Sequence, residues 1–207
     1  MTQIMTPSKT TTAGQIDKAV ANYRALLEKH SREFNAEVMQ TVLGQSELTE
    51  EQFAVLRRRV EAMSNLIVRC AKVNRNRTPQ EALDATGRKK YTDESVVEAM
   101  PKGKDKEVEV IFFKPRPEAY RDGWLSDEAL DKEFEFFGLE QADPYSVAAV
   151  NEADPAFADE YPNATHWKAN GKWCYAAFYR WLDGRSVRVY RDGSDWFDDW
   201  WFAGFRK

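Results

Sequence analysis

Apolar side chains recur at helical spacing through the first part of the chain. The first stripe advances in steps of three and four residues, which places its members on one face of a helix; they are Ile16, Val20, Tyr23, Leu27, His30 and Phe34. Val38 and Val42 continue the stripe, and Gly44 supplies a helix stop. The pattern predicts one helix of about 28 residues after a flexible tail at residues 1–14.

Three boundary signals predict a second helix after Gly44. Thr49 fits an N-cap, Gln52 completes a capping box, and Leu48 with Phe53 forms a hydrophobic staple. Apolar residues then follow the 3.5-residue spacing of a coiled-coil seam: Phe53, Leu56, Val60, Met63, Ile67 and Cys70. Two such helices joined by a short turn are expected to pair as an antiparallel hairpin.

Two short helices complete the helical region expected over residues 15–101. Thr78 and Glu81 repeat the capping box around Pro79, a residue favoured at the first helical position. Another short helix is expected between Thr92 and Pro101. The charged stretch at residues 102–106 resembles a linker, so a second domain is expected over residues 107–207.

In the second half, alternating apolar residues and turn signals predict strands. A strand is expected from Glu107 to about Phe112, followed by a helix that Ser126 caps and Gly138 closes. Three Asn-Gly or Asp-Gly turns then predict a meander of antiparallel strands near 165–169, 172–181, 186–191 and 200–206. Side chains on both faces of the strand at 172–181 are apolar, so short helices are expected to cover the sheet. The predicted fold class is α+β.

Composition and charge distinguish the two halves. Residues 1–106 carry 18 basic and 14 acidic side chains, net +4, whereas residues 107–207 carry 12 and 20, net −8, and hold all seven tryptophans. The Thr- and Ser-rich start lacks the apolar core of a signal peptide, and no apolar run reaches the roughly 18 residues of a membrane span. A cytoplasmic protein without a membrane partner is expected.

Candidate chemistry is sparse in this sequence. No metal-ligand motif and no phosphate-binding loop occurs, so neither a metal nor a cofactor is expected. The turn at Asn170-Gly171 could bring Cys174 near His166 as a thiolate–imidazolium couple. The alternative interpretation is that Cys174, among aromatic residues, is a small buried apolar residue.

Two surface features suggest partners. Ten basic residues between positions 57 and 90 face only three acidic ones, a density suited to phosphate contacts or to pairing with the acidic half; they are Arg57, Arg58, Arg59, Arg69, Lys72, Arg75, Arg77, Arg88, Lys89 and Lys90. Near the C-terminus, tryptophans lie beside aspartates in a pattern suited to binding a partner; this set is Trp196, Trp200, Trp201, Asp195, Asp198 and Asp199.

Several longer stretches resemble a group of bacterial and metagenomic proteins of uncharacterised function. The stretches are residues 74–83, residues 142–160 (ADPYSVAAVNEADPAFADE), Thr165-His166-Trp167 with residues 173–178, and residues 200–207 (WWFAGFRK). The resemblance covers about two thirds of the chain. The resemblance implies no activity, cofactor or functional residue.

The sequence favours a non-enzymatic interaction or accessory protein that binds an unknown protein partner or self-associates through the helical hairpin. One alternative is a nucleic-acid-binding accessory factor that uses the basic span at residues 57–90. A further alternative is a small hydrolase or thiol enzyme that uses His166 and Cys174.

Overall fold

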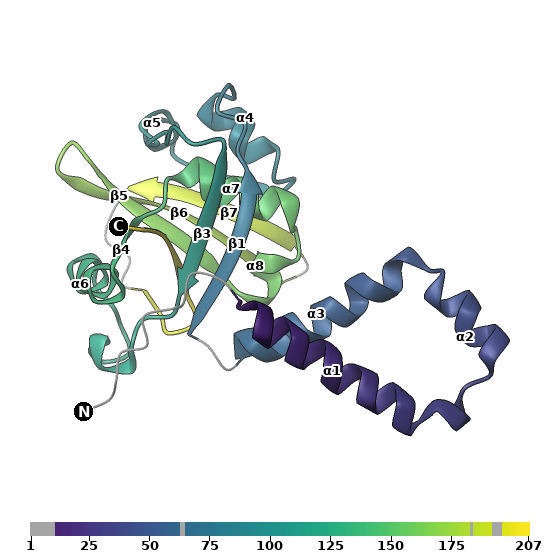
Figure 1. The fold of residues 1–207 in the computed structure, drawn as a ribbon. Helices are drawn as coiled ribbons and strands as arrows, with labels where there is room; N and C mark the ends of the chain where they lie inside the picture. The colour runs from purple at the N-terminus through teal and green to yellow at the C-terminus, as the bar shows by residue number, and fades with distance from the viewer. Residues whose placement is uncertain (1–10, 63–64, 183, 192–195) are drawn as a thin grey trace. The chain divides into compact units, whose positions relative to one another are not determined.

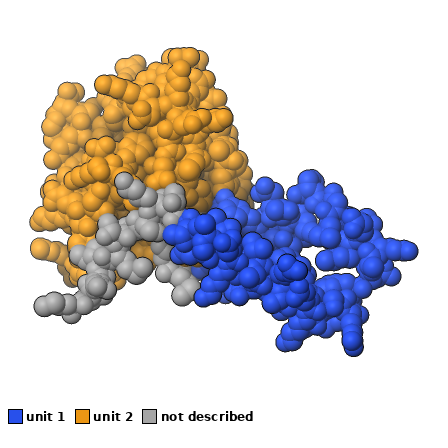
Figure 2. Space-filling view, in the orientation of Figure 1, with its two compact units in different colours: residues 1–59 blue, residues 60–207 orange. Residues whose placement is uncertain are grey.

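The computed structural model describes residues 11–62, 65–182, 184–191 and 196–207 (Figure 1). The chain divides into two compact units, residues 1–59 (unit 1) and residues 60–207 (unit 2), which are coloured separately in Figure 2. The first unit consists of helices, and the second consists of a mixed sheet covered by helices. The α+β fold class predicted from the sequence is confirmed.

Unit 1 contains α1 (Ala13–Lys29), the 3-10 helix η1 (Ser31–Glu33), α2 (Ala36–Leu43) and most of α3 (Ser46–Ala62). The single helix predicted over the first stripe is wrong, because the chain leaves helical geometry between α1 and α2. The side chain of Asn35 accepts hydrogen bonds from the backbone N–H groups of Glu37 and Val38, and so starts a new helix.

The second helix also begins earlier than predicted, at Ser46 rather than after Thr49. Gly44 keeps a right-handed conformation (φ −79°, ψ −7°), so the chain passes into α3 within two residues. Between α1 and α3, the amide of Gln52 donates a hydrogen bond of 2.6 Å to the hydroxyl of Tyr23. No side chain described in unit 1 is buried, so the tightly packed hairpin seam is not confirmed.

The predicted coiled-coil seam is wrong beyond Ala62. Ile67 and Cys70 lie instead in β1 (Leu66–Lys72), which pairs antiparallel with β3 (Glu107–Phe113). Within β1 the buried residues are Ile67 and Ala71, and Cys70 is exposed. Met63 lies outside the described residues. Hydrogen bonds to a strand some forty residues away along the chain therefore override the local helical spacing.

Eight strands of the described residues form one mixed sheet in unit 2, in the order β1-β3-β8-β5-β6-β7-β2, with β4 paired to β8 (Figure 1). The remaining strands are β2 (Lys89–Thr92), β4 (Leu139–Gln141), β5 (Asn163–Ala169), β6 (Lys172–Trp181), β7 (Gly184–Arg191) and β8 (Trp201–Arg206). Strands β5, β6 and β7 pair in sequence as antiparallel hairpins. All four strands predicted in this region occur within two residues of their expected limits.

The meander nevertheless stops at β7. Strand β8 lies between β3 and β5 and runs parallel to β5, and β2 joins the other edge parallel to β7. The region predicted as helical over residues 15–101 thus supplies β1 and β2, and the expected linker at residues 102–106 lies inside unit 2. Turn residues predict hairpins, but they carry no information about pairings across long connections.

Helices cover both faces of the sheet, as the apolar pattern of β6 predicts. Cys174, Ala176 and Phe178 join the core beneath α4 (Pro79–Asp84), α5 (Glu94–Glu98), α7 (Pro144–Ala153) and α8 (Phe157–Glu160). Tyr175 and Ala177 join a second core with α6 (Asp127–Phe137) on the opposite face. The caps predicted at Thr78 and Ser126 are confirmed, and Gly138 closes α6 at φ 66°.

Candidate functional site

The basic span does not form one surface, because it is divided between the two units. Arg57 and Arg59 are exposed in unit 1, and the side chain of Arg58 is not described. The remaining basic residues of the span belong to unit 2. There, several of these residues pair with acidic side chains, which is the alternative to phosphate contacts that the sequence left open.

Arg75 forms a buried ion pair with the N-cap residue of α7. Its Nη1 lies 2.7 Å from Oδ1 of Asp143, and its Nη2 donates to the hydroxyl of Ser146 at 2.9 Å. Both charged side chains are less than a tenth exposed. A guanidinium held in this way ties the loop after β1 to α7 and is not free to contact phosphates.

Three further basic side chains of the span have acidic or backbone partners. Arg77 donates to Glu152 of α7 at 2.9 Å, and Lys90 pairs with Asp84. The guanidinium of Arg88 is buried and donates to backbone carbonyls of Tyr179 and Pro155. Burial lowers the pKa of Arg88 to about 10.

The other basic residues of the span lie against aromatic or acidic neighbours. Arg69 stacks over the ring of Phe157 at 4.6 Å, and Lys89 lies 5.2 Å from the ring centre of Tyr91. Lys72 is 4.0 Å from Glu107 in an exposed pair. Much of the positive charge that is dense in the sequence is therefore matched within unit 2 itself.

The proposed couple of His166 and Cys174 is wrong. In the β5–β6 ladder His166 faces Tyr175, whereas Cys174 faces Trp167. Neighbouring residues of a strand point to opposite faces, so the imidazole and the thiol lie on opposite sides of the sheet. Cys174 is fully buried, and burial raises the pKa of its thiol. These features fit the structural role that the sequence left open.

The buried imidazole of His166 instead lies in a cluster with two carboxylates of α6, which the sequence did not predict. Its Nδ1 lies 3.0 Å from Oδ1 of Asp127, and its Nε2 lies 3.4 Å from Oδ1 of Asp131. The second contact is close enough for an ion pair but is not aligned as a hydrogen bond. The only sequence signal was the i, i+4 spacing of the two aspartates on one helix face.

Tryptophans of the proposed partner-binding set are mainly core residues. Trp196 and Trp201 are at most 9% exposed, so their rings are not available to a partner in this fold. Trp200 is half-buried and packs edge-on against Trp196. Trp196 and Trp201 therefore do not belong to an exposed partner-binding subset, because these large side chains fill the small cores beside the sheet.

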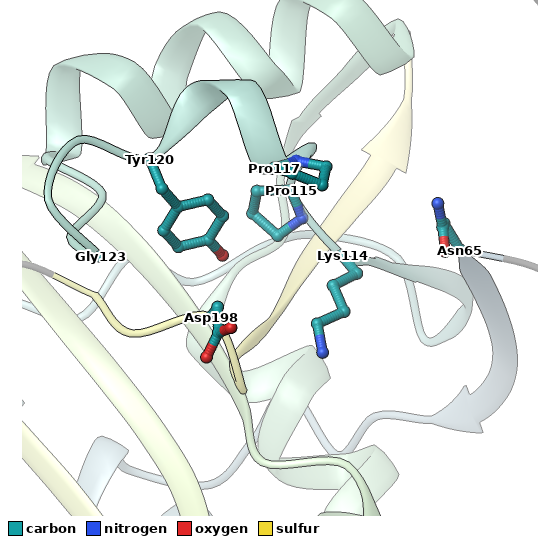
Figure 3. Close-up of a pocket in the computed structure, with 7 residues that line it drawn as sticks. All are labelled: Asn65, Lys114, Pro115, Pro117, Tyr120, Gly123 and Asp198. Carbon is teal, nitrogen blue, oxygen red and sulfur yellow. The ribbon is translucent and has the colours of Figure 1, made fainter.

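Among the aspartates of the same set, Asp198 and Asp199 are exposed and Asp195 lies outside the described residues. Within the described part of the chain, no cluster of three or more His, Cys, Asp or Glu side chains could hold a metal ion. Asp198 lines a cavity of about 270 Å³ together with Asn65, Lys114, Pro115, Pro117, Tyr120 and Gly123 (Figure 3).

This cavity offers one hydroxyl, one ammonium, one carboxylate and one side-chain amide. Figure 3 shows the Tyr120 hydroxyl and the Asp198 carboxyl on facing sides of the cavity. Burial, reinforced by the charges of Asp198 and Asp199, raises the pKa of Tyr120. The hydroxyl has no hydrogen-bond partner among the described residues, so it can donate to a bound group or to water. The volume of the cavity is at the small end of the range for ligand pockets.

The largest unexplained feature of α1 and α3 is their exposed apolar side chains. On α1, Ile16, Val20 and Tyr23 are 53%, 62% and 46% exposed. On α3, Phe53, Leu56 and Val60 are 51%, 52% and 60% exposed. We call these six side chains the apolar helix surface. They are the same positions whose spacing predicted amphipathic helices in the sequence.

Comparisons with known proteins identify no relative. No protein-family model, no curated protein and no solved structure matches the chain. Among the described residues, no helix is both long and apolar enough to cross a membrane. Inferences about function therefore rest on the residues and their geometry.

Proposed function

We propose that this protein is a non-enzymatic association protein in which the helices of unit 1 bind other protein chains. The proposal rests on one observation, the apolar helix surface. Each of its six side chains is about half exposed on a helix that has no buried residue among those described in unit 1. Amphipathic helices are stabilised mainly by burying such a face against another element.

The expected free energy of association follows from the exposed area. Complete burial of a large apolar side chain contributes about 1.5–3 kcal/mol, so a half-exposed one still has about 1 kcal/mol to gain. Six such residues offer roughly 6 kcal/mol, which is comparable with the lower estimates of the entropic cost of association. A moderate, reversible interaction is therefore more consistent with this surface than a permanent complex.

The placement of chemically active groups in unit 2 supports a non-enzymatic role. His166 is fully buried between two carboxylates, and Cys174 is fully buried on the other face of the sheet. Arg75 and Arg77 are held by the α7 residues Asp143 and Glu152. These groups serve to stabilise the sheet and its helices.

The test compares the wild-type chain with the double variant Val20→Gln/Leu56→Gln by light scattering and by native pull-down. Both residues are more than half exposed, so the substitutions should leave unfolding unchanged. The control is Leu182→Gln, which removes an apolar side chain that is 84% exposed in unit 2. We expect the wild type and the control to self-associate or to retain a bound protein, and the double variant to lose this interaction.

A wild-type chain that is strictly monomeric and that retains the same proteins as the double variant would contradict the proposal. In that case the exposed apolar side chains of α1 and α3 have no role in binding.

A further inference from the structure

The charges of α3 are unevenly distributed along the helix. Glu47, Glu50 and Glu51 occupy its first half, whereas Arg57, Arg58 and Arg59, together with Glu61, lie in its second half, which is net basic. None of the three glutamates has a basic residue three or four positions away, the spacing at which side chains pair within a helix. In α1, by contrast, Arg24 and Glu28 use this spacing and lie 2.9 Å apart.

Glu50 and Arg57 flank the same side of the apolar face of α3. Each precedes an apolar residue of that face by three positions, Phe53 and Val60 respectively. Glu50 and Arg57 are seven residues apart, which is about two turns of an α-helix. The two side chains therefore project from the same side of α3. Both are exposed, and Arg57 lies over the ring of Phe53 at 4.7 Å.

We propose that α3 pairs antiparallel with the α3 helix of a second copy of this chain, about a two-fold axis beside Phe53. The midpoint between positions 50 and 57 falls at Phe53-Ala54. A two-fold axis there places Glu50 of each copy opposite Arg57 of the other, because an isologous interface repeats every contact twice. Phe53 and Leu56 of the two copies then cover one another beside the axis, and Val60 of each copy lies at the level of position 47 of the other.

A second copy is favoured as the occupant because the charge pattern of α3 is complementary to itself only in the antiparallel direction. A parallel pair would place glutamates beside glutamates and arginines beside arginines. One helix face supplies less than the roughly 800 Å² per partner of a standard interface, so the expected dimer is weak and reversible. This inference rests on the proposed function, since it assigns the occupant of part of the apolar helix surface.

The same charges also suit an isolated helix, because acidic residues near an N-terminus and basic residues near a C-terminus favour the helix dipole. The two explanations differ in one respect. Favourable interaction with the dipole belongs to a single chain, whereas pairing between copies allows one altered chain to compensate for another. An experiment that mixes two variants with opposite charge changes therefore distinguishes the two explanations.

The experiment measures dimerisation of the full chain by sedimentation velocity for the wild type, for Glu50→Lys, for Arg57→Glu and for an equimolar mixture of these two variants. Each variant alone replaces two attractive contacts by two repulsive ones, so its dimer dissociation constant should rise about tenfold or more. The mixture should recover dimers close to the wild-type level, because both contacts are again attractive. Circular dichroism verifies that each variant retains its helices.

Matched controls make the same charge changes elsewhere in unit 1. Glu37→Lys in α2 and Arg32→Glu in η1 alter exposed residues that have no place in the proposed pairing, and they should dimerise like the wild type. A strictly monomeric wild type, or a mixture that dimerises no better than either variant alone, would overturn the α3 pairing. The proposed function would still stand if Val20→Gln/Leu56→Gln lost a bound protein, so the two failures are distinguishable.

Discussion

His166 Nδ1 lies 3.0 Å from Asp127 Oδ1, and the two side chains are 0% and 10% exposed. Asp131, one turn further along α6, approaches the other ring nitrogen at 3.4 Å. The imidazole also stacks on the ring of Phe134 of α6, with ring centres 5.5 Å apart. A histidine of β5 therefore holds α6 against the sheet through charge and through ring stacking, and its own imidazole is fully buried.

This cluster makes the stability of unit 2 dependent on pH. Burial alone lowers the pKa of His166, but the contacts with Asp127 and Asp131 outweigh burial and raise the net pKa above 6.5. A raised folded-state pKa means that the stabilising contribution is complete below about pH 6.5 and is lost as the pH rises through the folded value. The contact with His166 lowers the pKa of Asp131, so the contribution of Asp131 is lost only in acid, below about pH 3.8.

We expect the free energy of unfolding to fall as the pH is raised from about 6 to 9, by about 1.4 kcal/mol for each unit of pKa elevation. Urea unfolding followed by tryptophan fluorescence measures this in unit 2, because all seven tryptophans lie there. His166→Gln should remove the dependence, and His30→Gln in α1 should retain it. An unchanged pH profile in His166→Gln would show that folding does not raise the pKa of this imidazole.

Local signals in the sequence predicted much of the fold and little of this cluster. The caps at Thr78 and Ser126 depend only on residues within one helical turn, and the Asn170-Gly171 hairpin depends on two residues with positive φ. The contact between Asp127 and His166 joins residues 39 positions apart, and it exists only because α6 packs on β5 and β6. No local pattern encodes that approach.

The wrong predictions have the same physical origin. Ile67 and Cys70 continue the helical spacing in the sequence. In the structure, every residue of Leu66–Lys72 pairs instead with a residue of β3. Trp196 and Trp201 lie close to aspartates in the sequence, a pattern that favours a partner-binding surface. Their large rings instead fill the cores on either side of the sheet, which a neighbouring charge does not reveal.

Gly204 of β8 should not tolerate a side chain. A Cβ atom there would lie 2.9 Å from the backbone oxygen of Glu140 and 3.1 Å from a ring carbon of Phe134 in α6. The backbone oxygen belongs to the paired strand β4 and cannot rotate away. Gly204→Ala should therefore cost about 1–3 kcal/mol of unfolding free energy.

Thermal unfolding of Gly184→Ala provides the matched control for this substitution. Gly184 begins β7. The atom nearest to a Cβ added there would be the carbonyl oxygen of Trp181, at 3.9 Å, which is an ordinary contact. We expect this variant to unfold at the wild-type temperature. Equal stability of the two variants would show that β4 and α6 can move away from β8 at little cost.

The two cysteines should differ in reactivity. Cys70 is exposed on β1, whereas Cys174 is fully buried and burial raises the pKa of its thiol. Alkylation depends on the thiolate and on access, so the native protein should react at Cys70 and react at Cys174 only when unfolded. Titration of Cys70→Ser with a thiol reagent, with and without urea, measures this directly. Rapid reaction of the native variant would reopen a chemical role for Cys174.

Nucleic acid should bind weakly, despite the basic span. In unit 2 the guanidinium groups of Arg75 and Arg77 are paired with Asp143 and Glu152, and that of Arg88 is buried among backbone oxygens. Fluorescence anisotropy with DNA and RNA probes should therefore show little affinity even at low salt. Arg77→Gln should lower the free energy of unfolding and leave probe binding unchanged, because its partner is the carboxylate of Glu152.

The opposite result has a distinct signature. Binding that engages phosphates through several basic residues weakens linearly on a logarithmic salt scale, with a slope of about −0.9 per contact on duplex DNA. If such a slope appears and Arg57→Gln/Arg59→Gln reduces it by about two, the exposed arginines of α3 contact phosphates. The charges that we assign to pairing between two copies of α3 would then serve nucleic acid instead, and Arg57→Glu would abolish probe binding as well as dimerisation.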